Sequence, residues 1–313
     1  PRKYINIANE IEIATFPIME TIDSVLIIKC KNNLIVNLND TLCDPSKNFI
    51  KQEISKSKHS LLLKLAGYGD ADMININNNE KKFIEPIAAS KPAPGEILTS
   101  QAKKIGCTHA MHFSSFHKYV RTDSLWANSY TTPEKDLKRG WDQKIVYYEQ
   151  FSSIALTNDG FKKIDSIYPE YNNISIDPPE KFNDYWDQEP SGEDINLIKK
   201  YLTQIREVGN ESFRIKVGSK IISPHKSFDN ELIEKKFVLH APRNSLVRAI
   251  RLNIFDDLLI GNFAKLIIYS NQKSNYRKTL KFASKYIDNL EIKDAEELKT
   301  FLWVYRNSYD NKF

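Results

Sequence analysis

The sequence predicts an α/β fold in which a sheet-forming N-terminal part precedes an α-rich C-terminal region. Residues 24–28, 34–38 and 60–65 form short, almost continuous apolar runs, as expected for strands covered on both faces. In the C-terminal half, apolar residues recur at helical spacing in several longer segments. The pattern of apolar residues changes near residue 140, from mostly strand-like runs to mostly helical spacing. We therefore expect domains at 1–140 and 141–313.

The N-terminal part begins with an alternating strand and a hairpin. Residues 11–16 alternate, and the polar residues 31–33 form a turn between the next two apolar runs. The elements expected after the hairpin are a helix at 46–57, a strand at 60–65, a loop at 67–72, a polar excursion without core signal at 76–94, and a helix at 95–106 that a glycine ends. A brief strand and a histidine-rich loop follow this helix.

The C-terminal part contains two short strands and then mostly helices. Ser191 and Asp194 resemble a capping box, which opens a helix with apolar residues at helical spacing. The other expected elements are strands at 144–148 and 153–156, a strand pair at 213–222, one helix at 245–263 or two joined at Asn253, and helices at 276–287 and 295–305.

Composition describes an ordinary globular protein. Of the 313 residues, 41% are hydrophobic and 27% are charged, and the net charge of +5 is spread without a dense basic block. Nucleic acid is therefore not an expected partner, whereas an acidic or phosphorylated small substrate is compatible. No apolar run approaches the roughly 18 residues that span a bilayer. The first residue is Pro rather than Met, so the natural N-terminus is expected upstream.

Cysteine usage favours a cytoplasmic protein. The three cysteines, Cys30, Cys43 and Cys107, are odd in number and have no CxxC spacing. A disulfide framework or a thiolate zinc site is therefore not expected, and a reducing compartment is the simplest location.

Three of the six histidines, His109, His112 and His117, lie within nine residues. Histidine is the commonest metal ligand and titrates nearest neutral pH, so the cluster suggests metal or acid–base chemistry. The alternative is a surface loop that collects such residues without a shared role. His112 and His117 are five apart, which fits neither a helical nor a strand pair, so one of them is expected to be structural.

Asp40 directly follows an apolar strand. A carboxylate at this position can reach a metal from a rigid support, and the alternative is an Asx turn that closes the strand. Arg121, Trp126 and Asn128 follow His117 closely. Arginine can clamp a carboxylate or phosphate and tryptophan can stack on a sugar or base, whereas the alternative is that these residues anchor a long loop.

The remaining histidines carry no such expectation. His59 is expected at the surface, and His225 and His240 are expected in loops. The loop at 67–72 lacks the lysine of a phosphate-binding loop.

Several segments together resemble the metallo-β-lactamase-fold superfamily. They are the stretch at 16–30, Val-Asn-Leu-Asn-Asp at 36–40, Phe-Ser-Ser-Phe-His at 113–117, Asp-Ser-Leu-Trp-Ala-Asn at 123–128, and the stretches at 177–180, 184–190 and 255–263. The nearest branch contains sugar-lactonase-like enzymes and the catalytic part of CMP-N-acetylneuraminate hydroxylases. The resemblance is scattered over about residues 11–310.

This resemblance implies a partial αβ/βα sandwich with one or two zinc or iron ions. Asp40 would be the carboxylate that bridges the metals, and His117 would be the last histidine ligand, with His112 as the alternative. Arg121, Trp126 and Asn128 would line the substrate pocket. The implied activity is hydrolysis, or less favourably oxygen-dependent hydroxylation, of a small polar substrate such as a sugar- or nucleotide-linked one.

The sequence departs from the family at its main ligand motif. The family's H-x-H-x-D-H run is absent, and no two histidines occur at i, i+2. The chain therefore matches the second half of the sandwich, and an upstream segment or a partner chain is expected to supply the missing ligands. The alternative is a non-catalytic binding or assembly subunit that keeps the fold without the metal.

Overall fold

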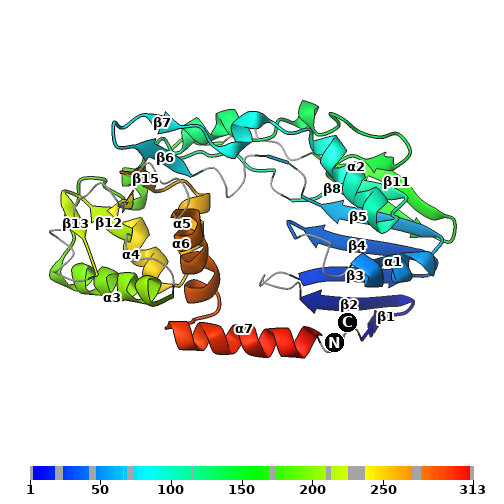
Figure 1. Ribbon diagram of the computed structural model, residues 1–313. Helices are drawn as coiled ribbons and strands as arrows, with labels where there is room; N and C mark the ends of the chain where they lie inside the picture. Colours follow the sequence, from blue (N-terminus) through cyan, green and yellow to red (C-terminus); the bar gives the residue numbers. More distant parts are fainter. Residues whose placement is uncertain are drawn as a thin grey trace. The chain divides into compact units, whose positions relative to one another are not determined.

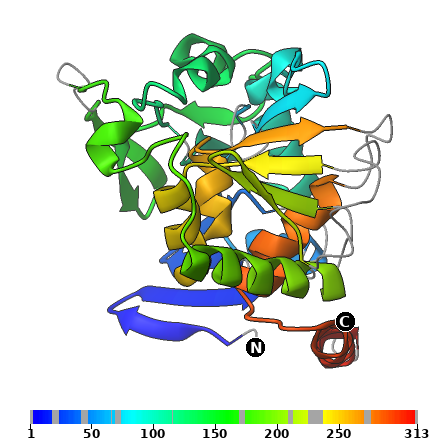
Figure 2. The same ribbon diagram turned by 90° about the vertical axis from the view of Figure 1, so that its left-hand side faces the viewer.

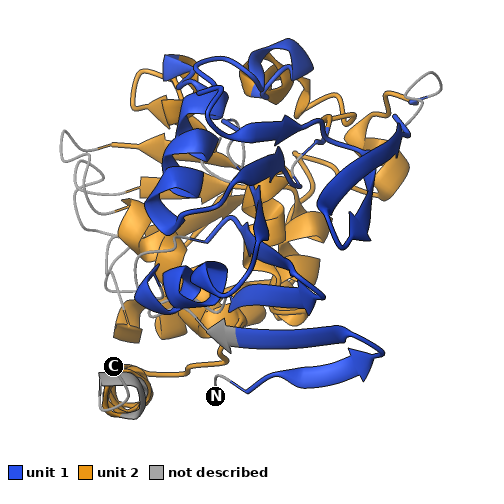
Figure 3. Ribbon diagram, turned by 90° about the vertical axis from the view of Figure 1, so that its right-hand side faces the viewer, with its two compact units in different colours: residues 1–68, 90–117, 131–174 blue, residues 69–89, 118–130, 175–313 orange. Residues whose placement is uncertain are grey.

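The computed structural model divides the chain into two compact units (Figure 3). It describes residues 3–17, 24–41, 47–65, 67–68, 74–114, 116–168, 174–208, 213–224, 237–269 and 276–310. Unit 1 comprises residues 1–68, 90–117 and 131–174, and unit 2 comprises 69–89, 118–130 and 175–313. The boundary expected at residue 140 falls inside unit 1, because the chain passes between the units several times.

Unit 1 is built on a seven-stranded mixed sheet (Figure 1). In spatial order its strands are β1 (Ile5–Ala8), β2 (Ile11–Pro17), β3 (Ser24–Cys30), β4 (Asn33–Asn39), β5 (His59–Lys64), β8 (His109–His112) and β9 (Val146–Tyr148). The first four pair antiparallel, and β4, β5, β8 and β9 pair parallel. The predicted hairpin at 24–38 is confirmed.

One face of this sheet packs on two helices, α1 (Lys47–Ser55) and α2 (Pro94–Ile105). The alternating residues Leu34, Val36 and Leu38 are fully buried in a cluster that includes Ile50 of α1 and Leu98 of α2. Helix α2 ends as predicted, because Gly106 adopts a φ of 92° that a side chain would oppose.

The opposite face is covered near the amino ends of the parallel strands by the hairpin of β10 (Ser152–Thr157) and β11 (Gly160–Ser166). The side-chain amide of Asn33 donates to the Thr157 carbonyl at 2.7 Å. The His109 ring stacks on Tyr148 and meets the edge of Phe161. Both faces of β4 are therefore covered at this end, which explains its nearly continuous apolar run at 34–38.

Unit 2 contains a six-stranded mixed sheet (Figures 1 and 2). In spatial order its strands are β13 (Lys220–Ile222), β12 (Phe213–Val217), β14 (Phe237–His240), β15 (Lys265–Ile268), β6 (Asn75–Asn78) and β7 (Phe83–Ile84). The expectation that residues 76–94 form an excursion without core signal is wrong, because β6 pairs with β15 and Ile76 is buried. His240 ends a strand, so its expected loop position is wrong too.

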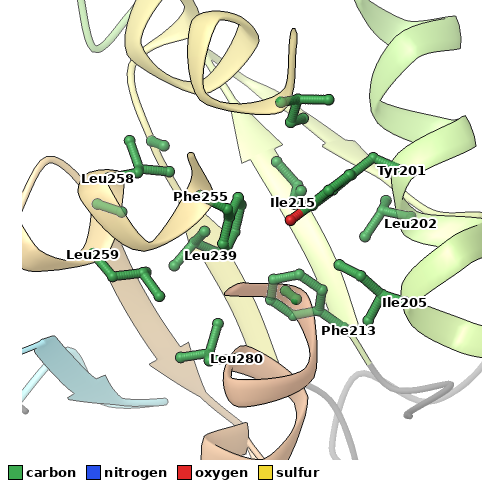
Figure 4. Close-up of a cluster of buried hydrophobic side chains, with 14 of the residues drawn as sticks. Tyr201, Leu202, Ile205, Phe213, Ile215, Leu239, Phe255, Leu258, Leu259 and Leu280 are labelled. Carbon is green, nitrogen blue, oxygen red and sulfur yellow. The ribbon is translucent and has the colours of Figure 1, made fainter. Parts of the chain in front are cut away.

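Helices cover one face of the unit 2 sheet. They are α3 (Gly192–Val208), α4 (Arg243–Arg251), α5 (Phe255–Ile260) and α6 (Tyr276–Phe282) with the π-helical turn Ala283–Asp288. Helix α7 (Ala295–Asp310) packs on α3, and its Leu298 joins the same hydrophobic core. Figure 4 shows their core, in which Ile205 of α3, Phe255 of α5 and Leu280 of α6 pack against Phe213 and Leu239 of the sheet. No helix in the described part of the chain is long and apolar enough to cross a bilayer.

Two local predictions in this unit are confirmed. The Asp194 N–H donates to the Ser191 hydroxyl at 3.1 Å, and the Ser191 N–H donates to the Asp194 carboxylate at 2.9 Å, which is a reciprocal capping box. The segment at 245–263 forms two helices, because Asn253 between them has a left-handed φ of 54°.

Short 3₁₀ helices occur in both units, at Ile87–Ser90, Leu125–Tyr130, Glu134–Asp136 and Pro179–Phe182.

Candidate functional site

The six predicted site residues divide between the two units. Asp40, His112 and His117 belong to unit 1, whereas Arg121, Trp126 and Asn128 belong to unit 2. The expected metal ligands and the expected substrate-binding residues therefore belong to different units.

Asp40 lies at the carboxyl edge of the parallel strands in unit 1. It directly follows β4 and is exposed. The Asn39 side-chain amide donates to its carboxylate at 3.1 Å, and the Asn39 N–H donates to the Asn37 side chain at 2.9 Å. This second bond is an Asx turn formed by Asn37 rather than by Asp40, and Asn39 adopts a φ of 47°. The turn closes β4 and leaves the Asp40 carboxylate toward solvent.

The loop after β8 reaches the end of β4. Strand β5 separates the two, so their backbones lie about 10 Å apart at the usual strand spacing. The loop crosses the end of β5, because the Phe113 N–H donates to the Lys64 carbonyl at 3.2 Å and the Ser114 hydroxyl donates to the Asn39 side-chain oxygen at 2.7 Å. The histidine-containing loop and the turn that carries Asp40 therefore meet at one edge of the sheet, where ligands of α/β folds gather.

His112 ends β8 and is buried. Its Nε2 lies 2.9 Å from the Leu137 carbonyl, to which it must donate, so the lone pair of the neutral ring is on Nδ1. Burial lowers the pKa of His112 to about 4 although this bond opposes the shift. A neutral imidazole fixed by a backbone carbonyl is typical of metal-ligating histidines. It is equally typical of a satisfied core histidine.

Lys64 places a positive charge beside His112. The two residues are register partners on β5 and β8, and the buried Lys64 ammonium donates to the Thr41 carbonyl at 2.7 Å. This charge opposes a cation in contact with His112. His117 lies five residues further along, half-buried and outside regular secondary structure. Within the described ranges, no group of three or more His, Cys, Asp or Glu side chains is arranged to hold a metal ion.

In unit 2, Arg121 is the centre of a buried ion-pair network. Its Nε and Nη2 each donate to a different oxygen of Asp123 at 2.8 Å, and its Nη1 donates to Asp184 at 2.6 Å. The Phe263 ring lies 4.1 Å from the guanidinium carbon. The Trp186 indole N–H donates to Asp123 at 2.8 Å. Three nitrogen donors of Arg121, the residue expected to bind substrate, are thus bonded to carboxylates within unit 2.

Asp184 connects this network to helix α4. Its carboxylate accepts a hydrogen bond from the Ser245 N–H at 2.8 Å and another from the Ser245 hydroxyl. The carboxylate therefore lies at the positive end of α4, where it stabilises the helix. Asp184 and Trp186 fall in a segment that carried the family resemblance. Their bonds, from Asp184 to Arg121 and from Trp186 to Asp123, join distant parts of the chain and follow no local spacing.

Asn128 and Trp126 also have internal contacts. Asn128 donates to the Tyr119 carbonyl at 2.7 Å and accepts from the Tyr119 N–H at 2.9 Å, so its amide brackets one residue of the backbone. The Trp126 ring packs edge-on against Phe83 and Tyr130. These contacts fit the alternative expectation for this segment, namely that its residues anchor a long loop.

Comparisons of this chain with protein-family models, with curated proteins and with solved structures find no match.

Proposed function

We propose that the chain is part of a metal-dependent hydrolase with a metallo-β-lactamase-like fold, with Asp40 as its bridging metal ligand. The substrate would be small and polar, such as a sugar- or nucleotide-linked molecule, and oxygen-dependent hydroxylation is the less favoured reaction. The supporting observation is the placement of Asp40: an exposed carboxylate at the carboxyl edge of parallel strands, in a turn that the β8 loop contacts.

The surroundings of Asp40 suit a metal ligand. Among the described residues, only the Asn39 amide donates to its carboxylate. Asn39 is in turn held by Asn37 and Ser114, so the turn is supported from two strands. A ligand whose neighbours are fixed in this way loses little conformational freedom when a metal binds.

Asp40 alone is not a site, because zinc and iron sites usually have three or more protein ligands. His117 is the first candidate for a further ligand, and His112 Nδ1 is the second. The proposal assigns the remaining ligands to an upstream segment or a partner chain. A bound zinc or iron ion would supply a water molecule of lowered pKa.

Zinc titration by calorimetry tests the role of Asp40 in protein that retains any natural upstream segment and any copurifying partner chain. The matched variants are Asp40→Asn and Asp159→Asn, since Asp159 is an exposed carboxylate of the same unit in the turn between β10 and β11. We expect Asp40→Asn to weaken zinc binding by at least about tenfold, which corresponds to about 1.4 kcal/mol, and Asp159→Asn to leave it unchanged. Equal affinity in both variants would refute the assignment.

A second candidate is a non-catalytic binding or assembly subunit. Two observations favour it: the described residues bring together no group of three ligands, and Arg121 and Asn128 are bonded internally. This candidate predicts no stoichiometric metal in the wild-type protein, so the same titration separates the two functions.

A further inference from the structure

Three basic side chains lie side by side on the unit 2 sheet. Lys216 of β12 is the register partner of His240 of β14, and His240 is the partner of Lys265 of β15. These strands are neighbours in the sheet (Figure 2, yellow-green, yellow and orange). Directly paired residues of adjacent strands have Cβ atoms about 5 Å apart, so the three side chains form one row.

The row faces away from the hydrophobic core. The preceding residue on β12, Ile215, pairs with Leu239, which pairs with Leu266, and all three are fully buried in the helix-covered core. Side chains alternate between the faces of a strand. Lys216, His240 and Lys265 therefore project from the other face, where all three are half-buried.

Trp186 packs directly on this row. The Lys265 ammonium lies 4.6 Å from the centre of the indole ring, and the His240 ring meets it edge-on with the two centroids 5.0 Å apart. The indole is itself held by its bond to Asp123. The row is thus supported from the side by a fixed aromatic residue.

The positive charge of the row has no acidic counterpart in the part of the chain that the structure describes. No carboxylate lies within ion-pair distance of Lys216 or Lys265 there, and Asp123 is already paired with Arg121. Burial lowers the pKa of His240 to about 4, and the charges of Lys216 and Lys265 add to this effect. The His240 Nε2 is buried and has no hydrogen-bond partner among the described residues.

An unsatisfied buried polar atom lowers stability, and two uncompensated ammonium groups beside it add repulsion. A multivalent oxyanion removes both costs, because it neutralises the lysines and gives the imidazole an acceptor. Phosphate fits best, since its charge of nearly −2 matches the two lysines and its oxygens can meet three donors at once. The amino end of α4 is not part of this site, because Asp184 already occupies it.

We propose that Lys216, His240 and Lys265 form a binding site for the phosphate group of a phosphorylated small molecule on the unit 2 sheet. The two ammonium groups contact phosphate oxygens. Because Nδ1 of His240 already bonds the Trp186 backbone, the ring takes up a proton from solvent when the dianion binds, and the imidazolium then donates to a third oxygen from Nε2. This site shares no residue with the proposed metal site in unit 1, and phosphate binding to metal-free protein is measured independently of it.

Calorimetric titration of the full, metal-free chain with inorganic phosphate and with pyrophosphate tests the site. We expect saturable binding that the double variant Lys216→Gln/Lys265→Gln weakens by about tenfold or more, since it removes both charged groups that contact the anion. The control Lys220→Gln removes an exposed lysine of the adjacent strand β13 and should bind as the wild type does. Lys265→Arg, which keeps the charge, should retain most of the affinity.

The indole N–H resonance of Trp186, assigned with Trp186→Phe, locates the binding. We expect phosphate to shift this resonance in the wild type and in Lys220→Gln. If the double variant does not fold, the single variants Lys216→Gln and Lys265→Gln provide the comparison. Absence of saturable binding to either anion, an equal loss in Lys220→Gln, or binding that leaves the Trp186 resonance unmoved would overturn the proposal.

Discussion

Asp288 is a buried carboxyl group in the interior of unit 2, and folding raises its pKa strongly. It ends the π-helical turn and is 3% exposed. The Tyr201 hydroxyl donates to it at 3.0 Å, and the Phe255 N–H donates at 2.5 Å. Burial raises the pKa of Asp288 to about 7 although both bonds oppose the shift. The carboxyl group is therefore protonated in the folded protein at mildly acidic pH.

This raised pKa predicts that stability falls as the pH rises. Between its unfolded value near 4 and its folded value of about 7, Asp288 holds its proton only in the folded state, so folding is favoured at low pH and loses that contribution by pH 7. The expected change is on the order of 3 kcal/mol. Urea unfolding at pH 5 and pH 8 measures it, and Asp288→Asn should abolish most of the difference. An unchanged difference in this variant contradicts the assignment.

Arg121 gives the second prediction at this scale. Arg121→Ala leaves Asp123 and Asp184 buried without their cation, so we expect a loss of about 3–5 kcal/mol in the free energy of unfolding. Arg251 forms an exposed ion pair with Glu193, and Arg251→Ala should cost less than about 1 kcal/mol. Equal effects in urea unfolding would show that the Arg121 network does not stabilise the unit.

At the scale of elements, the carboxylate of Glu53 links α1 to the unit 1 sheet. Glu53 is 3% exposed and accepts from Lys29 of β3, from Lys56 at 2.6 Å and from the Tyr4 hydroxyl at 2.6 Å. Burial alone would raise the pKa of Glu53, but the bonds from these three groups outweigh it and lower the pKa to about 2. The helix is therefore held to the sheet by charge as well as by apolar contacts.

A lowered carboxyl pKa has the opposite pH dependence to that of Asp288. The contribution of Glu53 is fully present above about pH 4.5 and is lost as the pH falls toward 2. We expect Glu53→Gln to destabilise the protein by about 2 kcal/mol at pH 7, less than for a fully buried pair because Lys56 is more than half exposed. Glu10→Gln, which breaks an exposed pair with Lys31, is the control. Equal unfolding free energies for the two variants would contradict this role.

Elements with strong local signals were predictable from the sequence. The hairpin at 24–38, α2 with its terminal glycine, and the capping box of α3 all depend on residues close together in the chain. Strands β6, β14 and β15 were missed, because each is only four residues long and is stabilised by partners far away in the sequence. The sheet of unit 2 is a non-local structure that periodicity does not reveal.

The candidate site was predictable only in part, for the same reason. The position of Asp40 at a strand end follows from the apolar run before it. The contacts of Arg121 do not, because Asp184 is distant in sequence and no spacing links the two. The row of Lys216, His240 and Lys265 depends on strand register, which the sequence alone did not specify.

At the scale of the whole molecule, the chain forms two mixed α/β units, each built from several separate segments of the sequence (Figure 3). Each unit has its own hydrophobic core and its own polar edge or face. The account assigns a different chemistry to each: a metal at the Asp40 edge of unit 1, and a phosphate group on the Lys216–Lys265 face of unit 2. The two assignments share no residue, so each is tested independently of the other.

Metal content per chain tests the central claim about unit 1 most directly. The measurement is elemental mass spectrometry on wild-type, Asp40→Asn and Asp159→Asn protein, purified with any natural upstream segment and any copurifying partner chain, and without a chelator or a histidine tag. The account predicts one or two zinc or iron ions per chain in the wild type and in Asp159→Asn, and a clear loss in Asp40→Asn. A metal-free wild type, or an Asp40→Asn variant that retains its metal, would contradict it.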